Sequence, residues 1–195
     1  TKLTSDKLFV AANQYSGGHD IRFSVVRYGN VMGSRGSVIP FFMKQKKSGV
    51  LTITDKKMTR FNILLQQGVD FVIQCFEKMW GGELFVPKIP SYRIMDVAKA
   101  IAPNCKHEIL GIRPGEKLHE EMITATDSLN SLEFEEYYVI LPAAQPHWDV
   151  KKFILESNGT PGKKVLDNFC YSSSTNLDFL TVEELRTLIN TKLHT

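Results

Sequence analysis

The order of secondary-structure signals along this chain constrains its fold more than any other feature of the sequence. Short runs rich in β-branched and aromatic residues, such as 21–28 and 83–87, alternate with amphipathic helical stretches, such as 62–80 and 181–193. Alternating strands and helices favour an α/β protein. A length of 195 residues fits one ordinary domain, or one large and one small lobe.

Other segments give weaker signals of the same kind. We expect further strands at 51–54, 108–112 and 137–141, and further helices at 1–15, 37–44, 91–101 and 118–122. Ser37 and Ser91 are placed to cap the helices that they open, because a serine hydroxyl can accept a hydrogen bond from a backbone N–H of the first turn.

Composition excludes several classes of protein. The 24 Lys and Arg against 21 Asp and Glu give a net charge of only +3, too little to indicate a nucleic-acid or membrane-surface protein. The longest apolar runs are too short for a transmembrane span. Cys75, Cys105 and Cys170 are odd in number and far apart, so we expect no disulfide framework, no metal site and a reducing, cytoplasmic setting.

The glycines lack the pattern that a complete dinucleotide-binding fold would show. None of the 13 glycines falls into a GxGxxG turn, which would cradle a dinucleotide pyrophosphate between a strand and a helix. The chain also opens directly on a helical pattern, without a signal peptide. Either this is not a Rossmann protein, or the dinucleotide-binding half lies upstream of Thr1 in a longer protein.

Four places in the sequence could carry chemistry: Lys2, the loop 27–38, the stretch 54–60 and the stretch 113–116. Each has an ordinary explanation when taken alone. Lys2 could be a solvated charge, the glycine- and serine-rich loop a simple turn, and Arg60 a cation that covers an aromatic edge. Arg113-Pro114-Gly115 has the composition of a turn, because proline pre-sets its φ and glycine accepts a positive φ.

Taken together, the motifs favour a different interpretation. RYGNVMGSRGSVIPFF, then TD..MTRF, then GIRPGEKLHE resembles the C-terminal half of the extended short-chain dehydrogenase/reductase family that acts on nucleotide sugars. Within that family the likeness is greatest to the inverting UDP-N-acetylglucosamine 4,6-dehydratases, and it runs through essentially the whole chain. It implies the C-terminal part of a Rossmann-like protein with a small α+β substrate-binding lobe. Residues 1–50 would end the Rossmann-like domain, and 51–195 would mostly form the lobe, with 62–87 returning to that domain.

The resemblance also implies roles for individual residues. Thr1-Lys2 looks like the end of the family's YxxxK motif, whose Tyr would be the third residue before Thr1. Lys2 would then be catalytic and would also bind the cofactor, since an ammonium one helical turn from the Tyr favours its phenolate. The cofactor, NADP or possibly NAD, would further be lined by Val31, Met32, Gly33, Ser34 and Arg35.

The same resemblance assigns the substrate contacts. Arg60 and Arg113 would bind the UDP diphosphate, because the planar guanidinium donates two parallel hydrogen bonds to phosphate oxygens. Glu116 would accept from the ribose hydroxyls, and the backbone near Thr54 would meet the uracil edge. Asn30 would hold the sugar or diphosphate, and Val38 opens a helix whose free N–H groups suit a phosphate.

The implied reaction is the dehydration of UDP-N-acetylglucosamine for pseudaminic acid or a related surface glycan. The sugar would be oxidised at C4, lose water across C5 and C6, regain hydride at C6 and be inverted at C5. The full-length enzyme would be a homo-oligomer, and this stretch alone would be inactive. Two alternatives stay open: a UDP-sugar 4-epimerase of the same family, and a non-catalytic nucleotide-sugar-binding protein.

Overall fold

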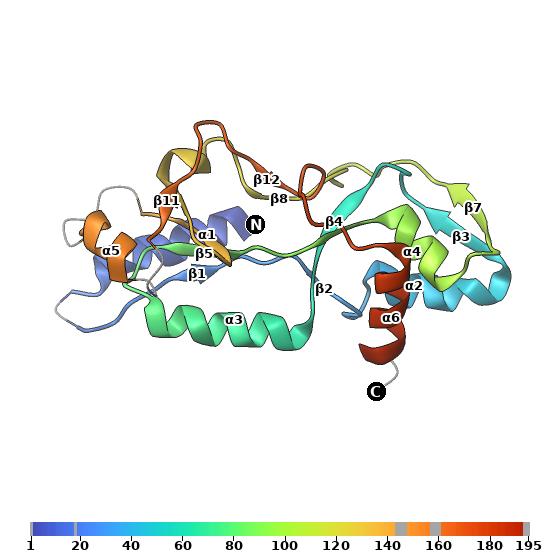
Figure 1. Ribbon diagram of the computed structural model, residues 1–195, viewed down its shortest axis with the longest axis horizontal. Helices are drawn as coiled ribbons and strands as arrows, with labels where there is room; N and C mark the ends of the chain where they lie inside the picture. The colour runs from blue at the N-terminus through green and yellow to red at the C-terminus, as the bar shows by residue number, and fades with distance from the viewer. Residues whose placement is uncertain (1, 18, 143–147, 157–160, 193–195) are drawn as a thin grey trace. The chain divides into compact units, whose positions relative to one another are not determined.

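A computed structural model describes residues 2–17, 19–142, 148–156 and 161–192 (Figure 1). The chain forms two compact units, each assembled from three separate stretches. Unit 1 contains Thr1–Tyr28, Gln66–Lys88 and Met122–Cys170, and unit 2 contains Gly29–Leu65, Ile89–Glu121 and Tyr171–Thr195. The predicted α/β class is confirmed, because helices alternate with strands of which three pairs run parallel.

Unit 1 is built around a five-stranded sheet with the order β1-β5-β10-β9-β11. β1 pairs in parallel with β5, and the remaining neighbours are antiparallel. The strands of this sheet are β1 (Val25–Val26), β5 (Leu84–Pro87), β9 (Ser131–Glu133), β10 (Tyr137–Ile140) and β11 (Lys163–Lys164). The other elements are α1 (Lys2–Ala12), α3 (Leu65–Lys78), α5 (Val150–Glu156), β8 (Glu121–Ile123) and the 3₁₀-helices Asn13–Tyr15 and Asp127–Asn130.

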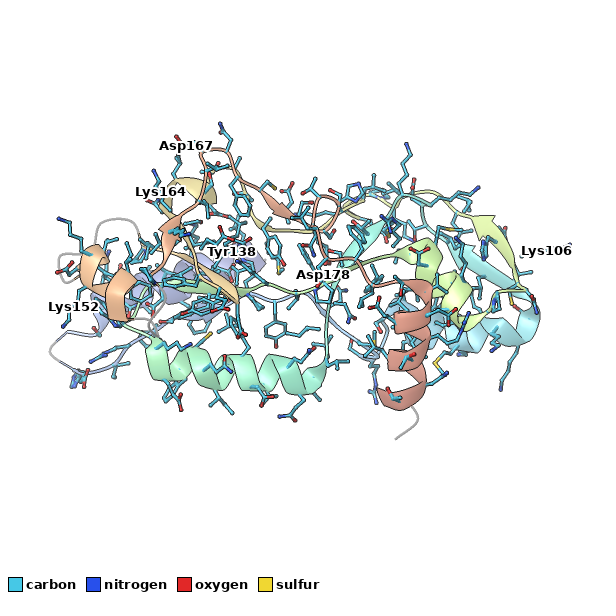
Figure 2. The ribbon with its side chains drawn as sticks, viewed as in Figure 1. Lys106, Tyr138, Lys152, Lys164, Asp167 and Asp178 are labelled. Atoms are coloured by element: carbon cyan, nitrogen blue, oxygen red, sulfur yellow. The ribbon has the colours of Figure 1, made fainter. Side chains whose placement is uncertain are left out.

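Aromatic side chains fill the core of unit 1. Phe134 stacks on Tyr137 with ring centroids 4.9 Å apart, and Trp80 meets Phe153 edge to face at 5.2 Å. Such pairs add about 0.5–1.5 kcal/mol to the burial of their area. Tyr138, labelled in Figure 2, contacts the Phe169 ring at 5.3 Å and carries the Lys88 ammonium 5.0 Å above its own ring.

Unit 2 combines two small sheets with three helices. Its three-stranded sheet has the order β2-β4-β6, and β3 pairs in parallel with β7. The strands are β2 (Asn30–Val31), β3 (Val50–Ile53), β4 (Thr59–Ile63), β6 (Ser91–Arg93), β7 (Lys106–Ile109) and β12 (Tyr171–Ser172). The helices are α2 (Val38–Gln45), α4 (Ile94–Ile101), α6 (Val182–Lys192) and the 3₁₀-helix Lys46–Ser48. They enclose a hydrophobic core that includes Phe42, Leu51, Ile53, Val97 and Leu185.

Most of the predicted elements are present, and three predictions are wrong in a physically informative way. Residues 62–63 were expected to begin a helix but complete β4, where the N–H of Asn62 donates to the carbonyl of Pro90 at 2.8 Å. Ser91 was expected to cap a helix but lies fully buried in β6, and α4 begins three residues later. The helix expected at 118–122 is replaced by an extended segment that runs into β8.

α3 is amphipathic as predicted, but its apolar residues lie on more than one face. Gly68 and Cys75 are buried, whereas Val69, Ile73 and Phe76 are exposed. Burial raises the pKa of the Cys75 thiol to about 12, so this cysteine stays protonated and unreactive at neutral pH. None of the helices in the described ranges has the length and apolar character that crossing a bilayer requires.

Glu83 is a fully buried carboxyl next to the sheet of unit 1. It accepts the N–H of Trp80 at 2.6 Å. Burial is the largest influence on this group and raises its pKa, although backbone hydrogen bonds and the Ser24 side chain oppose that effect. The folded protein therefore favours the protonated form of Glu83.

This environment predicts a pH-dependent effect of Glu83→Gln. A carboxyl with a raised folded-state pKa contributes stability that is complete below its ordinary pKa and is lost as the pH rises through the raised value. The glutamine side chain of the variant stays neutral throughout, so its melting temperature should rise relative to that of the wild type as the pH increases above 4.5, the ordinary pKa of a glutamate side chain. Thermal unfolding followed by circular dichroism measures this difference.

The matched control is Glu135→Gln, which changes an exposed carboxylate in the same unit. Its melting temperature should follow that of the wild type at every pH. A Glu83→Gln difference that is independent of pH would contradict the assignment of a raised pKa to this carboxyl.

Candidate functional site

Most of the predicted substrate residues lie on one segment of unit 2, residues 110–120, or at the strands β3 and β4 that hold it. The N-terminal end of this segment is fixed to the end of β3. The N–H of Leu110 donates to the carbonyl of Ile53 at 2.9 Å, and the N–H of Gly111 donates to the carbonyl of Thr54 at 3.1 Å. Thr54 therefore lies directly beside the start of the segment that carries Arg113 and Glu116.

Arg113 and Glu116 are brought together by a tight turn. The N–H of Glu116 donates to the Arg113 carbonyl at 3.0 Å, and Gly115 has a φ of 82°. Proline followed by a glycine with positive φ is the pattern of a type II turn, so the predicted turn is confirmed. The Glu116 carboxylate accepts the backbone N–H of Arg113 at 3.4 Å, and the Arg113 side chain is exposed.

Arg60 fixes the C-terminal part of the 110–120 segment. Its guanidinium donates to the carbonyls of Thr59, Leu118 and Lys117 at 2.7, 3.0 and 2.9 Å. Three of the five guanidinium N–H groups are thus used on backbone carbonyls, and Nε lies 3.7 Å from a carboxylate oxygen of Glu120. In this structure Arg60 anchors the segment, and its predicted contact with a diphosphate would use the remaining donors.

A buried chain of hydroxyl groups supports the same stretch. The Thr59 hydroxyl lies 2.8 Å from His119 Nδ1 and 2.8 Å from the hydroxyl of Ser173. Ser173 is fully buried; its hydroxyl accepts the N–H of Glu120 at 2.9 Å, and its own N–H donates to the Glu120 carbonyl at 2.8 Å. Both backbone groups of Glu120 are therefore fixed by one serine.

Glu120 is a site residue that the sequence analysis missed. Its carboxylate accepts the N–H of Phe61 at 3.4 Å, lies beside Arg60 and faces the amide of Asn30. With the amide nitrogen turned toward Glu120, that nitrogen lies 2.8 Å from each carboxylate oxygen. The structure thus joins Asn30 and Arg60, two of the predicted substrate residues, through a third side chain.

Gly29 lets the strand of Asn30 come close to β4. A Cβ on Gly29 would lie 2.5 Å from the Cβ of Phe61 and 3.2 Å from the Ile89 side chain, closer than packed atoms approach. Asn30 follows directly and pairs in parallel register with Asn62 of β4. The glycine therefore sets the position of the Asn30 backbone.

The residues predicted to line a cofactor form the loop between β2 and α2. Met32 is buried and donates its N–H to the Ile63 carbonyl at 2.9 Å, Gly33 has a φ of 73°, and Ser34 and Arg35 are exposed. Val38, the first residue of α2, packs against the hydrophobic core of unit 2. Ser37 occupies the capping position, but its hydroxyl makes no capping bond and is a buried oxygen without a hydrogen-bond partner in the described structure.

Lys2 lies in unit 1, as the first residue of α1, and its side chain is outside the described part of the chain. The helix expected at the start of the chain is confirmed from Lys2 to Ala12. Among the described residues, no group of three or more His, Cys, Asp and Glu side chains is arranged to hold a metal ion.

Comparison with known proteins identifies the family. The family model described as "Polysaccharide biosynthesis protein" matches residues 1–142. The chain belongs to this family. The match includes the strands and loops that carry Asn30, Arg60, Arg113 and Glu120.

Two groups of curated relatives resemble the chain over nearly its whole length. A UDP-N-acetylglucosamine 4,6-dehydratase (inverting) of Campylobacter jejuni subsp. jejuni is 53% identical over 192 residues, which is 97% of this chain and 58% of that protein. A UDP-glucose 4-epimerase of Rickettsia conorii is 36% identical over 196 residues, covering 98% of this chain and 56% of that protein. The chain therefore spans somewhat more than half the length of the curated relatives it matches.

A solved structure supports the fold. The X-ray structure of Pen from Bacillus thuringiensis superposes with a TM-score of 0.82 and 33% sequence identity, covering all of this chain and 57% of the other. The architecture of both units thus has an experimentally observed counterpart.

The buried hydroxyl chain predicts that Ser173→Ala destabilises unit 2. The substitution removes the acceptor of the Glu120 N–H and a hydrogen-bond partner of Thr59, both in a buried setting. An unsatisfied buried donor costs about 1–3 kcal/mol, so the free energy of unfolding should fall by about that amount. Urea unfolding followed by circular dichroism measures it.

Thr175→Ala is the matched control, because Thr175 lies two residues further on and is exposed. Exposed substitutions of this kind change stability by less than about 0.5 kcal/mol. Equal effects of the two alanine variants would show that the Ser173 hydroxyl does not support the segment.

Proposed function

We propose that this chain is the substrate-binding part of a UDP-N-acetylglucosamine 4,6-dehydratase that inverts C5, acting in the synthesis of pseudaminic acid or a related surface glycan. The observation that carries the proposal is the 53% identity over 192 residues to the Campylobacter dehydratase. The relatives of this type are longer, so we propose that the natural protein has a comparable length and that its remaining residues complete the active site.

The geometry of unit 2 supports a nucleotide-sugar site along the 110–120 segment. Thr54 and Arg60 fix the two ends of a stretch whose middle is the Arg113–Glu116 turn. The turn presents an exposed guanidinium, which suits a diphosphate, next to a carboxylate, which suits ribose hydroxyls. A uracil edge beside the Thr54 backbone completes the proposed UDP contacts, with Asn30 and Val38 on the sugar and phosphate side.

The loop between β2 and α2 fits a nicotinamide cofactor. The Ser37 hydroxyl, buried and without a hydrogen-bond partner among the described residues, lies in the chain between the proposed cofactor residues Val31–Arg35 and Val38, and a ligand oxygen would satisfy it. When bound, the cofactor, NADP in our proposal, supplies the redox chemistry at C4 of the sugar. Lys2 would assist the Tyr expected four positions before it by favouring its phenolate, as one turn of helix places the two side chains on the same face.

The reaction determines which residues are needed from outside this chain. Loss of water across C5 and C6 requires a base at C5 and an acid at the C6 hydroxyl, and we propose that both come from the remaining residues of the natural protein. The chain's own contribution is to bind the diphosphate and hold the sugar. The present 195 residues alone are accordingly expected to be inactive, and a homo-oligomeric state and a cytoplasmic location belong to the same proposal.

A 4-epimerase is the second candidate, favoured by the 36% identity to the Rickettsia UDP-glucose 4-epimerase. The epimerase's 36% identity to this chain is lower than the 53% identity of the dehydratase, over nearly the same residues. The two activities differ in product, because an epimerase retains the C6 hydroxyl whereas a dehydratase loses water.

The deciding experiment incubates the full-length natural protein with UDP-N-acetylglucosamine and NADP⁺. A product lighter than the substrate by one water, with a keto group at C4 and inverted C5 by NMR, is expected. UDP-N-acetylgalactosamine would indicate the epimerase instead, and nucleotide binding without turnover would indicate a non-catalytic binding protein.

The proposed role of Arg113 predicts a selective effect on substrate affinity. Arg113→Ala removes a charged donor to the diphosphate, and such hydrogen bonds contribute about 1.5–3 kcal/mol. The KM for UDP-N-acetylglucosamine should rise by about 10- to 100-fold, and the affinity for UDP measured by calorimetry should fall equally.

Arg186→Ala is the matched control. Arg186 lies on α6, where it is partly exposed and pairs with Glu183 at 2.6 Å, and an ion pair of this kind contributes little. KM should remain at the wild-type value in this variant. An unchanged KM in Arg113→Ala would show that the guanidinium of Arg113 does not bind the diphosphate.

A further inference from the structure

Two side chains of the predicted substrate site, those of Asn30 and Arg60, meet the carboxylate of Glu120. We propose that Glu120 is a positioning residue whose carboxylate fixes the side-chain amide of Asn30 in the orientation that meets the nucleotide sugar. The proposal rests on the proposed function for the identity of the ligand. The contact between the Glu120 and Asn30 side chains is inferred from the geometry of unit 2 alone.

The carboxylate determines which way the Asn30 amide points. One end of a carboxamide is a donor and the other an acceptor, and the two are nearly equal in shape. With the nitrogen toward Glu120, that nitrogen lies 2.8 Å from both carboxylate oxygens. The reverse orientation would place the amide oxygen against two carboxylate oxygens, so three acceptors would meet without a proton between them. Only one orientation is therefore favourable.

Glu120 can do this because it is itself held in place from several sides. Ser173 bonds both its backbone N–H and its carbonyl, at 2.9 and 2.8 Å. Its carboxylate receives the N–H of Phe61 at 3.4 Å and lies 3.7 Å from Nε of Arg60. The Glu120 side chain is 30% exposed, so these contacts, more than bulk solvent, define its position.

The arrangement gives the site a fixed amide before any ligand arrives. An asparagine whose amide can rotate must be ordered when the ligand binds, and that ordering lowers affinity. A binding group whose rotamer is already fixed by a supporting hydrogen bond avoids this loss. Glu120 thus acts on the ligand through Asn30, which distinguishes it from the directly binding role proposed for Arg113.

The test is a double-mutant cycle in the full-length protein with Glu120→Ala, Asn30→Ala and the double variant. Glu120→Ala should raise the KM for UDP-N-acetylglucosamine about 5- to 10-fold and change kcat by less than about twofold. In the Asn30→Ala background the same substitution should raise KM by less than about twofold, because a residue that acts through Asn30 has nothing left to position. A merely structural role would give equal effects in both backgrounds.

Glu121→Ala is the control, since Glu121 is the adjacent, exposed carboxylate. It should leave KM unchanged. The comparison separates the effect of removing the Glu120 carboxylate from the effect of removing any negative charge from the segment. Equal effects of Glu120→Ala with and without Asn30, or an unchanged KM, would overturn the proposal.

A second measurement keeps failure of this inference distinct from failure of the proposed function. The Asn30 side-chain amide signals in a ¹H–¹⁵N spectrum of the ligand-free protein should shift in Glu120→Ala and not in Glu121→Ala. If the wild type neither binds nor converts the nucleotide sugar, the proposed function fails. This spectrum still shows whether the Glu120 carboxylate contacts the Asn30 amide. Identical Asn30 amide signals in the wild type and in Glu120→Ala would exclude a contact between the two side chains.

Discussion

The attachment of residues 110–120 to β4 is the constraint on which the candidate site depends. A glycine-containing connection of this length has little structure of its own, and here the Arg60 guanidinium binds its carbonyls while Thr59 and Ser173 fix its C-terminal end. The Arg60 guanidinium binds backbone carbonyls of the segment, whereas at its C-terminal end the side chains of His119 and Glu120 also contact Thr59 and Arg60. The Arg113 side chain, in the middle of the segment, is exposed.

Sequence patterns were sufficient for the local parts of this arrangement. The Arg113–Glu116 turn follows from proline and glycine at successive positions, and Val50–Ile53 and Tyr137–Ile140 follow from β-branched and aromatic runs. Nothing local distinguishes Glu120 from Glu121, because the partners of Glu120 lie on other strands. The same reason explains the wrong helix at 118–122: its residues fit a helix, but hydrogen bonds to Thr59 and Ser173 hold them extended.

Burial raises the pKa of ionisable groups in both units, since it also raises the pKa of Tyr171 in unit 2 to about 12. In unit 1 burial dominates, so Cys75 and Glu83 both have raised pKa values and favour their neutral forms. In unit 2 the charged side chains of Arg60 and Glu120 remain partly exposed and paired.

The chain passes between its units after Tyr28, Leu65, Lys88, Glu121 and Cys170. Neither unit can consequently be excised as a single uninterrupted gene fragment, and removal of the chain beyond any of the first four points takes strands or helices from both units. Transfer of unit 2 to another protein by recombination would require several junctions at once. Inheritance of the two units as one block is the simpler evolutionary route, which accords with relatives that match across both.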